Sequence, residues 1–203
     1  MKINIKYLLI LTLIFIVFTA IGTVSHEFGH ILVAKYFGYE TTLHFGSMSY
    51  DMGQIVDYSS FFWIALGGPM QTMLTGLLGL LIVLYRKEHI NRNGLKLIDW
   101  VAVFLSLFWL RQVFNVMMSI VIGFFSPTGS FFTGDEAILS EELNLWEGTI
   151  TISLGLIGLL ISVYIVFRIV PREIRFTFIL SGLLGGILGF IFWMKILGPV
   201  LLP

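Results

Sequence analysis

The chain has 203 residues, of which 57% are hydrophobic and only 12% are charged. This balance excludes an ordinary water-soluble domain and indicates that lipid surrounds most of the chain. The formal net charge is zero, so the composition gives no reason to expect a nucleic-acid partner. Cysteine is absent, which excludes disulfides and thiolate metal sites and leaves histidine and carboxylate as metal ligands. We expect a single polytopic membrane domain over residues 1–203.

Five apolar segments follow one another along the chain, and each is long enough to cross a bilayer as a helix. They cover about residues 7–34, 61–85, 97–125, 149–170 and 176–197. The first segment could instead be a signal peptide cleaved near Phe18-Thr19-Ala20, but cleavage there would leave the polar motif at residues 26–30 beside a new terminus. The sequence therefore predicts an all-α integral membrane protein with about five transmembrane helices.

Polar connections separate the predicted helices. Residues 38–60 contain a β-like stretch at about 41–48 and a turn near Asp51-Met52-Gly53, and they predict a short β-hairpin or a re-entrant loop after the first helix. Gly67-Gly68-Pro69 is expected near the start of the second helix, where proline is tolerated. Residues 86–96 predict a short basic loop. Residues 126–148 are acidic, and Thr133 or Asp135 could cap a helix there.

Lysine and arginine are distributed unevenly between the two sides that five spans define. One side carries Lys2, Lys6, Arg86, Lys87, Arg92, Lys96, Arg168, Arg172 and Arg175, whereas the other carries Lys35 and Lys195. Because basic residues are enriched in cytoplasmic loops, the N-terminus is predicted to be cytoplasmic. The chain is then a multi-pass protein of the cell membrane whose 38–60 and 126–148 connections face outward.

The first apolar segment contains the motif His26-Glu27-Phe28-Gly29-His30. Two histidines four residues apart on a helix lie on the same face, so both imidazoles can bind one metal ion. A glutamate between them is typical of a helix that holds zinc and supplies a general base. Such histidines can also be satisfied by hydrogen bonds in a core, but ionisable groups in an apolar span are costly and usually mark function. The motif therefore predicts Zn²⁺ ligation by His26 and His30, with Glu27 as the catalytic residue.

A third zinc ligand must come from elsewhere in the chain, because catalytic zinc usually has three protein ligands. His89 is excluded, since the span count places it on the cytoplasmic side. The candidates on the correct side are His44, Asp51, Asp57 and Asp135. Asp135 is preferred because Gly134 leaves space beside it and because it leads a helix at the membrane depth of His30. Its alternative role is that of a simple helix N-cap.

Two polar residues of the third apolar segment, Arg111 and Asn115, are predicted at a similar depth. Either side chain could donate a hydrogen bond to the oxyanion formed during peptide hydrolysis, or bind the substrate backbone. Arg111 could equally form an ion pair with a carboxylate of the acidic connection. Both residues are therefore candidates for substrate binding or oxyanion stabilisation.

At these residues the chain resembles the site-2 protease family of intramembrane zinc metalloproteases. The segment at 26–30 matches the family motif His-Glu-x-x-His. Gly68-Pro69-Met70-Gln71-Thr72 matches the beginning of the family's Gly-Pro-x-x-Asn element, and Gly134-Asp135-Glu136 occupies the place of its third-ligand aspartate, which glycine often follows. The resemblance covers roughly residues 22–145. It implies that His26, His30 and Asp135 bind zinc and that Glu27 is catalytic.

The preferred interpretation is an intramembrane zinc metalloendopeptidase that cleaves a membrane protein or peptide in or beside the bilayer. A catalytically silent membrane protein that only binds its partners is the first alternative, but it would not need a general base. A metal transporter is the second alternative. It would need polar ligands as far as the cytoplasmic face, whereas residues 149–167 offer only serine and threonine hydroxyls and one tyrosine.

Overall fold

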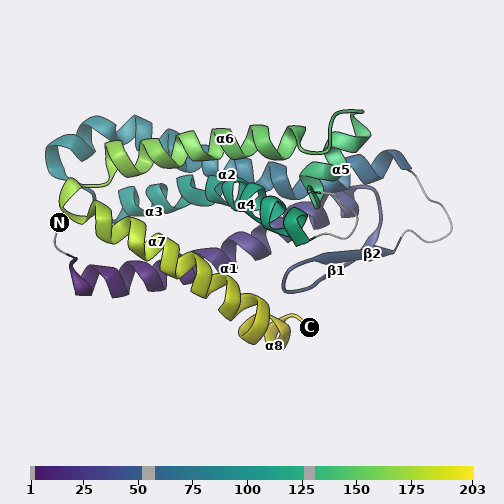
Figure 1. Ribbon diagram of the computed structural model, residues 1–203, viewed down its shortest axis with the longest axis horizontal. Coiled ribbons are helices and arrows are strands. Elements are labelled where there is room, and N and C mark those ends of the chain that lie inside the picture. Colours follow the sequence, from purple (N-terminus) through teal and green to yellow (C-terminus); the bar gives the residue numbers. More distant parts are fainter. Residues whose placement is uncertain (1–2, 52–57, 126–130) are drawn as a thin grey trace.

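The computed structural model describes residues 3–51, 58–125 and 131–203. Figure 1 shows the long helices running along the longest axis of the molecule, with the N-terminus at one end and the β-hairpin and α5 toward the other. In chain order the elements are α1 (Ile5–Tyr36), β1 (Glu40–Leu43), β2 (Met48–Asp51), α2 (Tyr58–Asn93), α3 (Leu97–Ser106), η1 (Leu107–Trp109), α4 (Leu110–Phe125), α5 (Asp135–Glu142), α6 (Thr149–Tyr164), η2 (Ile165–Ile169), α7 (Arg172–Phe192), η3 (Trp193–Leu197) and α8 (Gly198–Leu201).

Five helical segments of the described chain are long and apolar enough to cross a membrane. They are Ile5–Tyr36, Ser59–Asn93, Leu97–Phe125, Thr149–Ile169 and Arg172–Leu201. The antiparallel hairpin β1–β2 follows the first of them and pairs Glu40 with Asp51 and Leu43 with Met48. The predicted fold class, an all-α membrane protein of about five spans with a short hairpin after the first, is confirmed.

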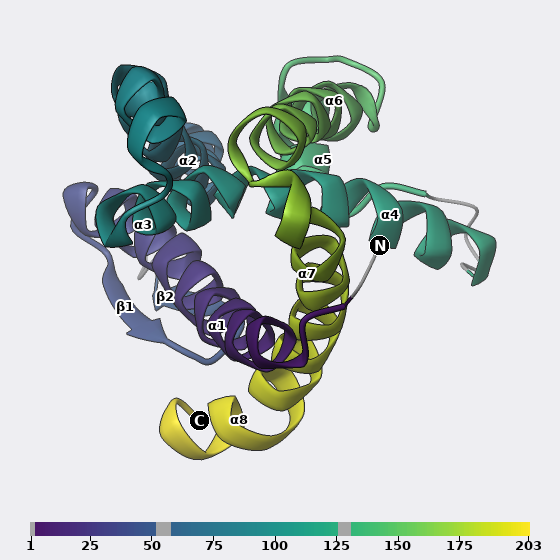
Figure 2. The ribbon, with the colours of Figure 1, turned by 90° about the vertical axis from the view of Figure 1, so that its left-hand side faces the viewer.

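Helix α1 is the element around which the others pack. It contacts α7 most extensively and α2 next. Figure 2 shows α2 and α3 on one side of the molecule and α4 and α6 on the other, with α1 and α7 side by side between them. Near the N-terminal end, the ring of Phe15 lies 4.9 Å from that of Phe104 and 5.3 Å from that of Phe178, measured between centroids. This aromatic cluster joins α1, α3 and α7.

The predicted loop at residues 86–96 is wrong over most of its length, because α2 continues to Asn93. Charged residues here mark where the helix leaves the apolar layer, and arginine, lysine and glutamate are themselves good helix formers. Within this last part of α2, Arg86 forms an ion pair with the buried carboxylate of Asp99 in α3, which also accepts a hydrogen bond from the backbone N–H of Lys96. These contacts fix the short connection between α2 and α3.

Two local predictions also need correction. The hairpin turns at residues 44–47, where the N–H of His44 donates to the carbonyl of Ser47, so the β-like stretch at 41–48 is interrupted and Asp51 belongs to β2. Met52 and Gly53 of the predicted turn lie outside the described residues. Pro69 is well inside α2 rather than at its first turn. It therefore removes the hydrogen bond that residue 69 would donate to the carbonyl of Ala65.

The C-terminal segment holds the hairpin turn. The indole N–H of Trp193 donates to the carbonyl of Phe45 at 2.6 Å, and the N–H of Phe45 donates to the carbonyl of Leu202. Backbone polar groups in an apolar environment need such partners, so these bonds allow an irregular turn to lie against the helices.

We expect Gly79→Ala to lower the thermal stability of the protein and Gly186→Ala to leave it unchanged or slightly raised. A Cβ at Gly79 would lie 2.7 Å from the carbonyl oxygen of Ala102 in α3, whereas a Cβ at Gly186 would meet open space. Overpacking typically costs about 1–3 kcal/mol, while alanine otherwise favours a helix over glycine. Thermal unfolding in detergent, followed by tryptophan fluorescence, measures the unfolding midpoint of each variant. Equal midpoints for the two variants would contradict the close α2–α3 contact.

Candidate metal centre

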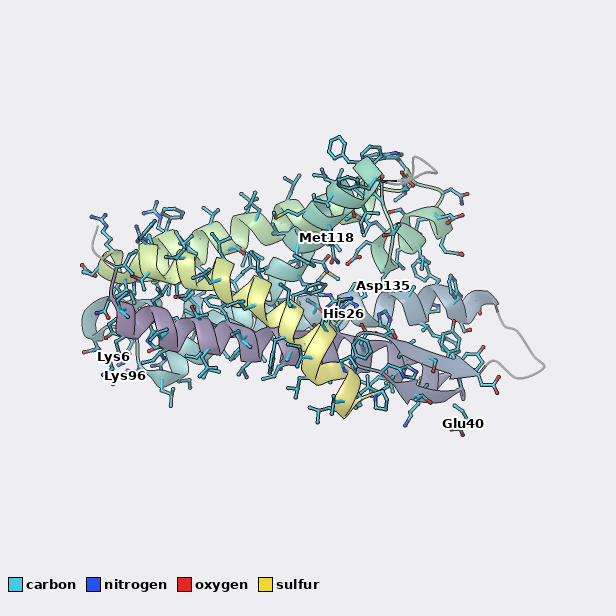
Figure 3. The ribbon with its side chains drawn as sticks, turned by 60° about the horizontal axis from the view of Figure 1, so that its bottom comes forward. Lys6, His26, Glu40, Lys96, Met118 and Asp135 are labelled. Carbon is cyan, nitrogen blue, oxygen red and sulfur yellow. The ribbon has the colours of Figure 1, made fainter. Side chains whose placement is uncertain are left out.

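Helix α1 places the histidine–glutamate motif inside the protein. His26, Glu27 and His30 are all buried, with exposures of 1%, 6% and 6%. The helix repeat brings both imidazoles to one face, and their Nε2 atoms lie 3.2 Å apart. Figure 3 shows His26 meeting Asp135 between the two ends of the molecule, which are marked by Lys6 and Lys96 on one side and Glu40 on the other.

Glycines in α1 and α2 create the space for this pair. Gly29 and Gly67 face each other so closely that a Cβ on Gly67 would lie 2.6 Å from the carbonyl oxygen of Gly29. The next residue, Gly68, faces the imidazoles, and a Cβ there would overlap the Nε2 atoms of both His26 and His30. The predicted Gly-Pro element of α2 is thus a wall of the site, and a side chain at Gly68 would fill the place where the ring nitrogens converge.

Asp135 reaches the same point from α5. The Oδ2 atom of its carboxylate lies 3.0 Å from Nε2 of His26 and 3.2 Å from Nε2 of His30. Asp135 is the first residue of α5, and the N-cap is Gly134, with a φ of 87° that favours glycine. The alternative prediction, in which Thr133 or Asp135 caps the helix, is therefore wrong. The structure brings together the three predicted ligands, although Asp135 is 109 residues from His26 and 105 residues from His30 in the sequence.

The three atoms fit a tetrahedral metal ion. Zn–N and Zn–O distances of about 2.0–2.1 Å place neighbouring ligand atoms of a tetrahedron about 3.3 Å apart. The observed separations of 3.0, 3.2 and 3.2 Å are close to that edge. His26, His30 and Asp135 are accordingly a group that could hold a metal ion.

The remaining ring nitrogens are fixed by partners on α2. Nδ1 of His30 lies 2.6 Å from the carbonyl oxygen of Ile64, and because a carbonyl only accepts, Nδ1 carries the hydrogen. Nδ1 of His26 lies 2.9 Å from the hydroxyl of Thr72, which accepts when the ring carries its hydrogen on Nδ1 and donates in the other tautomer. In the tautomer with hydrogen on Nδ1, both Nε2 atoms present lone pairs, which a cation between them and Oδ2 of Asp135 would bind. Such partners orient metal-binding histidines and hold the correct tautomer.

Neither of these partners was predicted from the sequence. Thr72 stands where the resemblance led us to expect asparagine, and no contact with His26 was predicted for it. Its position one helical turn after Gly68 was the available signal, since both residues then face α1. The carbonyl of Ile64 carries no side-chain signal, so only the packing of α2 on α1 could identify it.

Arg111 of α4 lies beside the predicted catalytic residue. Its Nη2 atom is 4.0 Å from Oε1 of Glu27, at the limit of an ion pair. The buried Nε of Arg111 has no hydrogen-bond partner within the part of the chain that the structure describes. The predicted ion pair with the acidic connection is therefore not the contact seen, although Glu136 of that connection lies within electrostatic reach.

Asn115, one helical turn after Arg111, contacts Glu136, for which no role was predicted from the sequence. Its amide nitrogen lies 3.2 Å from Oε1 and 3.3 Å from Oε2 of Glu136.

Burial, followed by the charge of Asp135, raises the pKa of Glu136. Burial would also raise the pKa of Asp135, but its contacts with His26 and His30 outweigh that effect and hold the pKa below its ordinary range.

The other candidate ligands are not near this group. The two ring nitrogens of His44 contact the main-chain oxygen of Pro203 and the hydroxyl of Ser49. Nδ1 of His89 contacts the side-chain amide of Asn93 near the end of α2. Asp51 ends β2, and Asp57 lies outside the described residues.

Two buried histidines and a half-buried aspartate that could hold a metal ion lie among five helices that are long and apolar enough to cross a membrane, which is the arrangement of a multi-pass membrane protein. The family model described as Peptidase M50B-like matches residues 4–139, about two thirds of the chain. The chain belongs to this family, and the site-2 protease resemblance is confirmed at that level. No curated protein and no solved structure matches the chain.

Family membership supports a protease of the intramembrane metallopeptidase type, a class that generally depends on zinc and acts on peptide substrates in a membrane environment. The match includes α1 to α4, the hairpin and the first half of α5, and therefore all three residues of the metal group. Helices α6, α7 and α8 lie outside it.

We expect Thr72→Val to weaken metal binding by about 10- to 100-fold, the usual effect of removing a hydrogen-bond partner from a metal-binding histidine. Valine keeps the shape of threonine but lacks the hydroxyl that contacts Nδ1 of His26. Thr72→Ser keeps the hydroxyl and serves as the matched control. Competition with a zinc-binding dye measures the affinity of each purified variant. Wild-type affinity in Thr72→Val would show that this contact does not orient His26.

Proposed function

We propose that this chain is an intramembrane zinc metalloendopeptidase that hydrolyses peptide bonds of membrane-embedded or membrane-adjacent substrates, with residues 1–203 acting as one domain. The observation that carries the proposal is the convergence of His26, His30 and Asp135 within 3.2 Å of one another, next to Glu27. Buried ionisable groups in a membrane-spanning helix are costly, and a site of this composition accounts for their presence.

The charges around the group favour a divalent cation. The carboxylates of Glu27, Asp135 and Glu136 surround one cationic side chain, Arg111, among the described residues. The carboxylate of Asp135 stays ionised, because its contacts with His26 and His30 hold its pKa low. An ionised carboxylate in a poorly solvated region is costly without a partner, and one Zn²⁺ ion would provide it. This charge and the tetrahedral spacing of the ligand atoms support the same ion.

Zinc held by His26, His30 and Asp135 would act as a Lewis acid, which lowers the pKa of water and polarises a peptide carbonyl. Glu27 has the position of the general base, because it adjoins the ligand His26 on α1. Its carboxylate would accept a proton from the attacking water and deliver it to the leaving amine. Arg111, 4.0 Å away, would orient that carboxylate.

Of the two predicted oxyanion donors, Arg111 is the better placed. Its Nε has no partner among the described residues, so the guanidinium retains a donor for a substrate carbonyl or the oxyanion that forms from it. The amide nitrogen of Asn115 already donates to Glu136. Asn115 would have to give up that contact to bind the substrate.

A substrate must reach this site in an extended form, because a helical backbone hides its carbonyl groups in hydrogen bonds. The β1–β2 hairpin lies toward the end of the molecule that also holds α5 (Figure 1). Its strand edges could pair with an unwound segment of a membrane protein or peptide. The hairpin is therefore our candidate for the element that holds the substrate.

The basic residues suggest the orientation. Lys6 and Lys96 lie at one end of the molecule and Glu40 at the other (Figure 3). The positive-inside rule then places the N-terminus in the cytoplasm and the hairpin on the outer side of the cell membrane.

We expect Glu27→Gln to retain zinc but to lose at least about 100-fold in cleavage rate, because glutamine keeps the size of the side chain but cannot accept the proton. Co-expression with candidate single-span membrane proteins, followed by detection of cleaved fragments, measures activity. Zinc content of the purified proteins is measured in parallel. His26→Ala provides the contrast, since it should lose both zinc and cleavage.

The two alternatives make different predictions for the same samples. A catalytically silent protein would show no cleavage in wild type or in Glu27→Gln, and a transporter would move zinc into vesicles. Wild-type protein without zinc above background would overturn the proposed function.

A further inference from the structure

We propose that Glu136 is a positioning residue of the metal centre. Held by Asn115, its carboxylate fixes α5 against α4 and thereby keeps Asp135 at ligand distance from His26 and His30. The inference rests on the proposed metal site but concerns a residue outside the predicted site.

Glu136 is fully enclosed, with an exposure of 2%. Both of its carboxylate oxygens lie within 3.3 Å of the amide nitrogen of Asn115. A buried carboxylate needs such a partner, because an unpaired one costs far more than an apolar side chain of the same volume. The contact therefore constrains where Glu136 can lie. A leucine or methionine would fill the space without fixing the direction of the side chain.

The position of Asp135 depends on contacts of this kind. Helix α5 has eight residues, too few to be stable by itself, so its place is set by packing, most extensively against α2 and then α6, and by its side-chain contact with α4. Leu139 and Ser140 provide other anchors: Leu139 is buried, and the hydroxyl of Ser140 accepts from the N–H of Ile150. Both lie about one turn beyond the ligand, whereas Glu136 is adjacent to Asp135. Its bond to Asn115 joins α5 to α4 at the residue next to the ligand.

Helix α4 connects this contact to the catalytic side of the site. Arg111 and Asn115 are four residues apart and therefore share a helix face. Arg111 reaches Glu27 of α1, and Asn115 reaches Glu136 of α5. One face of α4 thus spans from the proposed base to the residue beside the third ligand. A substitution of Glu136 should change the position of Asp135 and weaken zinc binding. The cleavage rate should fall only as a consequence of that change.

The test compares Glu136→Ala, Glu136→Gln, Asn115→Ala and the double alanine variant in the full chain. Zinc affinity is measured by competition with a chelating dye. We expect Glu136→Ala and Asn115→Ala each to weaken zinc binding by about 10- to 100-fold, as for other groups that orient metal ligands. Glu136→Gln should stay within a few-fold of wild type, because its amide oxygen can accept the same bond. The double variant should be no weaker than the weaker single variant, because both substitutions remove one contact.

A spectroscopic readout separates positioning from a general loss of stability. Co²⁺ replaces zinc, and its visible absorption reports the ligand geometry. The bands should change in Glu136→Ala and return toward wild type in Glu136→Gln. Glu141→Ala is the matched control, because Glu141 is an exposed residue of the same helix. If Glu136→Ala does not fold, Asn115→Ala removes the same contact while leaving the sequence of α5 intact.

The outcomes distinguish the two proposals. Wild-type protein that binds no zinc would contradict the proposed function itself. Wild-type protein that binds zinc, together with unchanged affinity and Co²⁺ spectrum in Glu136→Ala and Asn115→Ala, would overturn the positioning role alone. Additive losses in the double variant would also overturn it, since the two residues would then not act through one bond.

Discussion

The structure depends on the need to pair ionisable groups within helices that lipid surrounds. His26, Glu27 and His30 are buried in α1, a helix long and apolar enough to cross a membrane, where an unpaired charge or polar atom is costly. Their partners come from three other helices: Thr72 and the carbonyl of Ile64 from α2, Arg111 from α4, and Asp135 from α5. The positions of α2, α4 and α5 around α1 are therefore constrained by the contacts that these three buried residues need.

Small residues make the required distances possible. Helices approach closely only where neither carries a side chain at the contact, and Gly29 and Gly67 provide such a contact between α1 and α2. Gly68 then leaves room between the imidazoles that any side chain would occupy. Gly134 serves a different purpose, because its positive φ turns the chain into α5 directly before Asp135. The glycines of these motifs are thus parts of the site as much as the residues that carry its chemistry.

The fold was largely predictable because its main signal is local. Apolar length determines which segments can cross a bilayer, and the five spans follow from it. The hairpin was indicated instead by the β-like stretch within the polar connection at 38–60. The predicted element boundaries were wrong where a polar stretch was interpreted as the end of a helix or strand. Residues 86–93 remain helical although many are charged, and the hairpin turns at 44–47, inside the predicted β-like stretch at 41–48. Polarity locates the boundary of the apolar layer, whereas hydrogen bonding decides where a helix or strand ends.

The sequence by itself determined the pair of histidines and the adjacent glutamate, because helical spacing alone places them on one part of α1. It also favoured Asp135, since the parity of the spans limits which carboxylates can reach that depth. Only the tertiary structure decided the other contacts: Thr72 with His26, Ile64 with His30, and Asn115 with Glu136, pairs separated by 46, 34 and 21 residues. Such contacts depend on how helices rotate and approach one another, and that rotation is fixed by packing across the whole chain rather than by any local pattern.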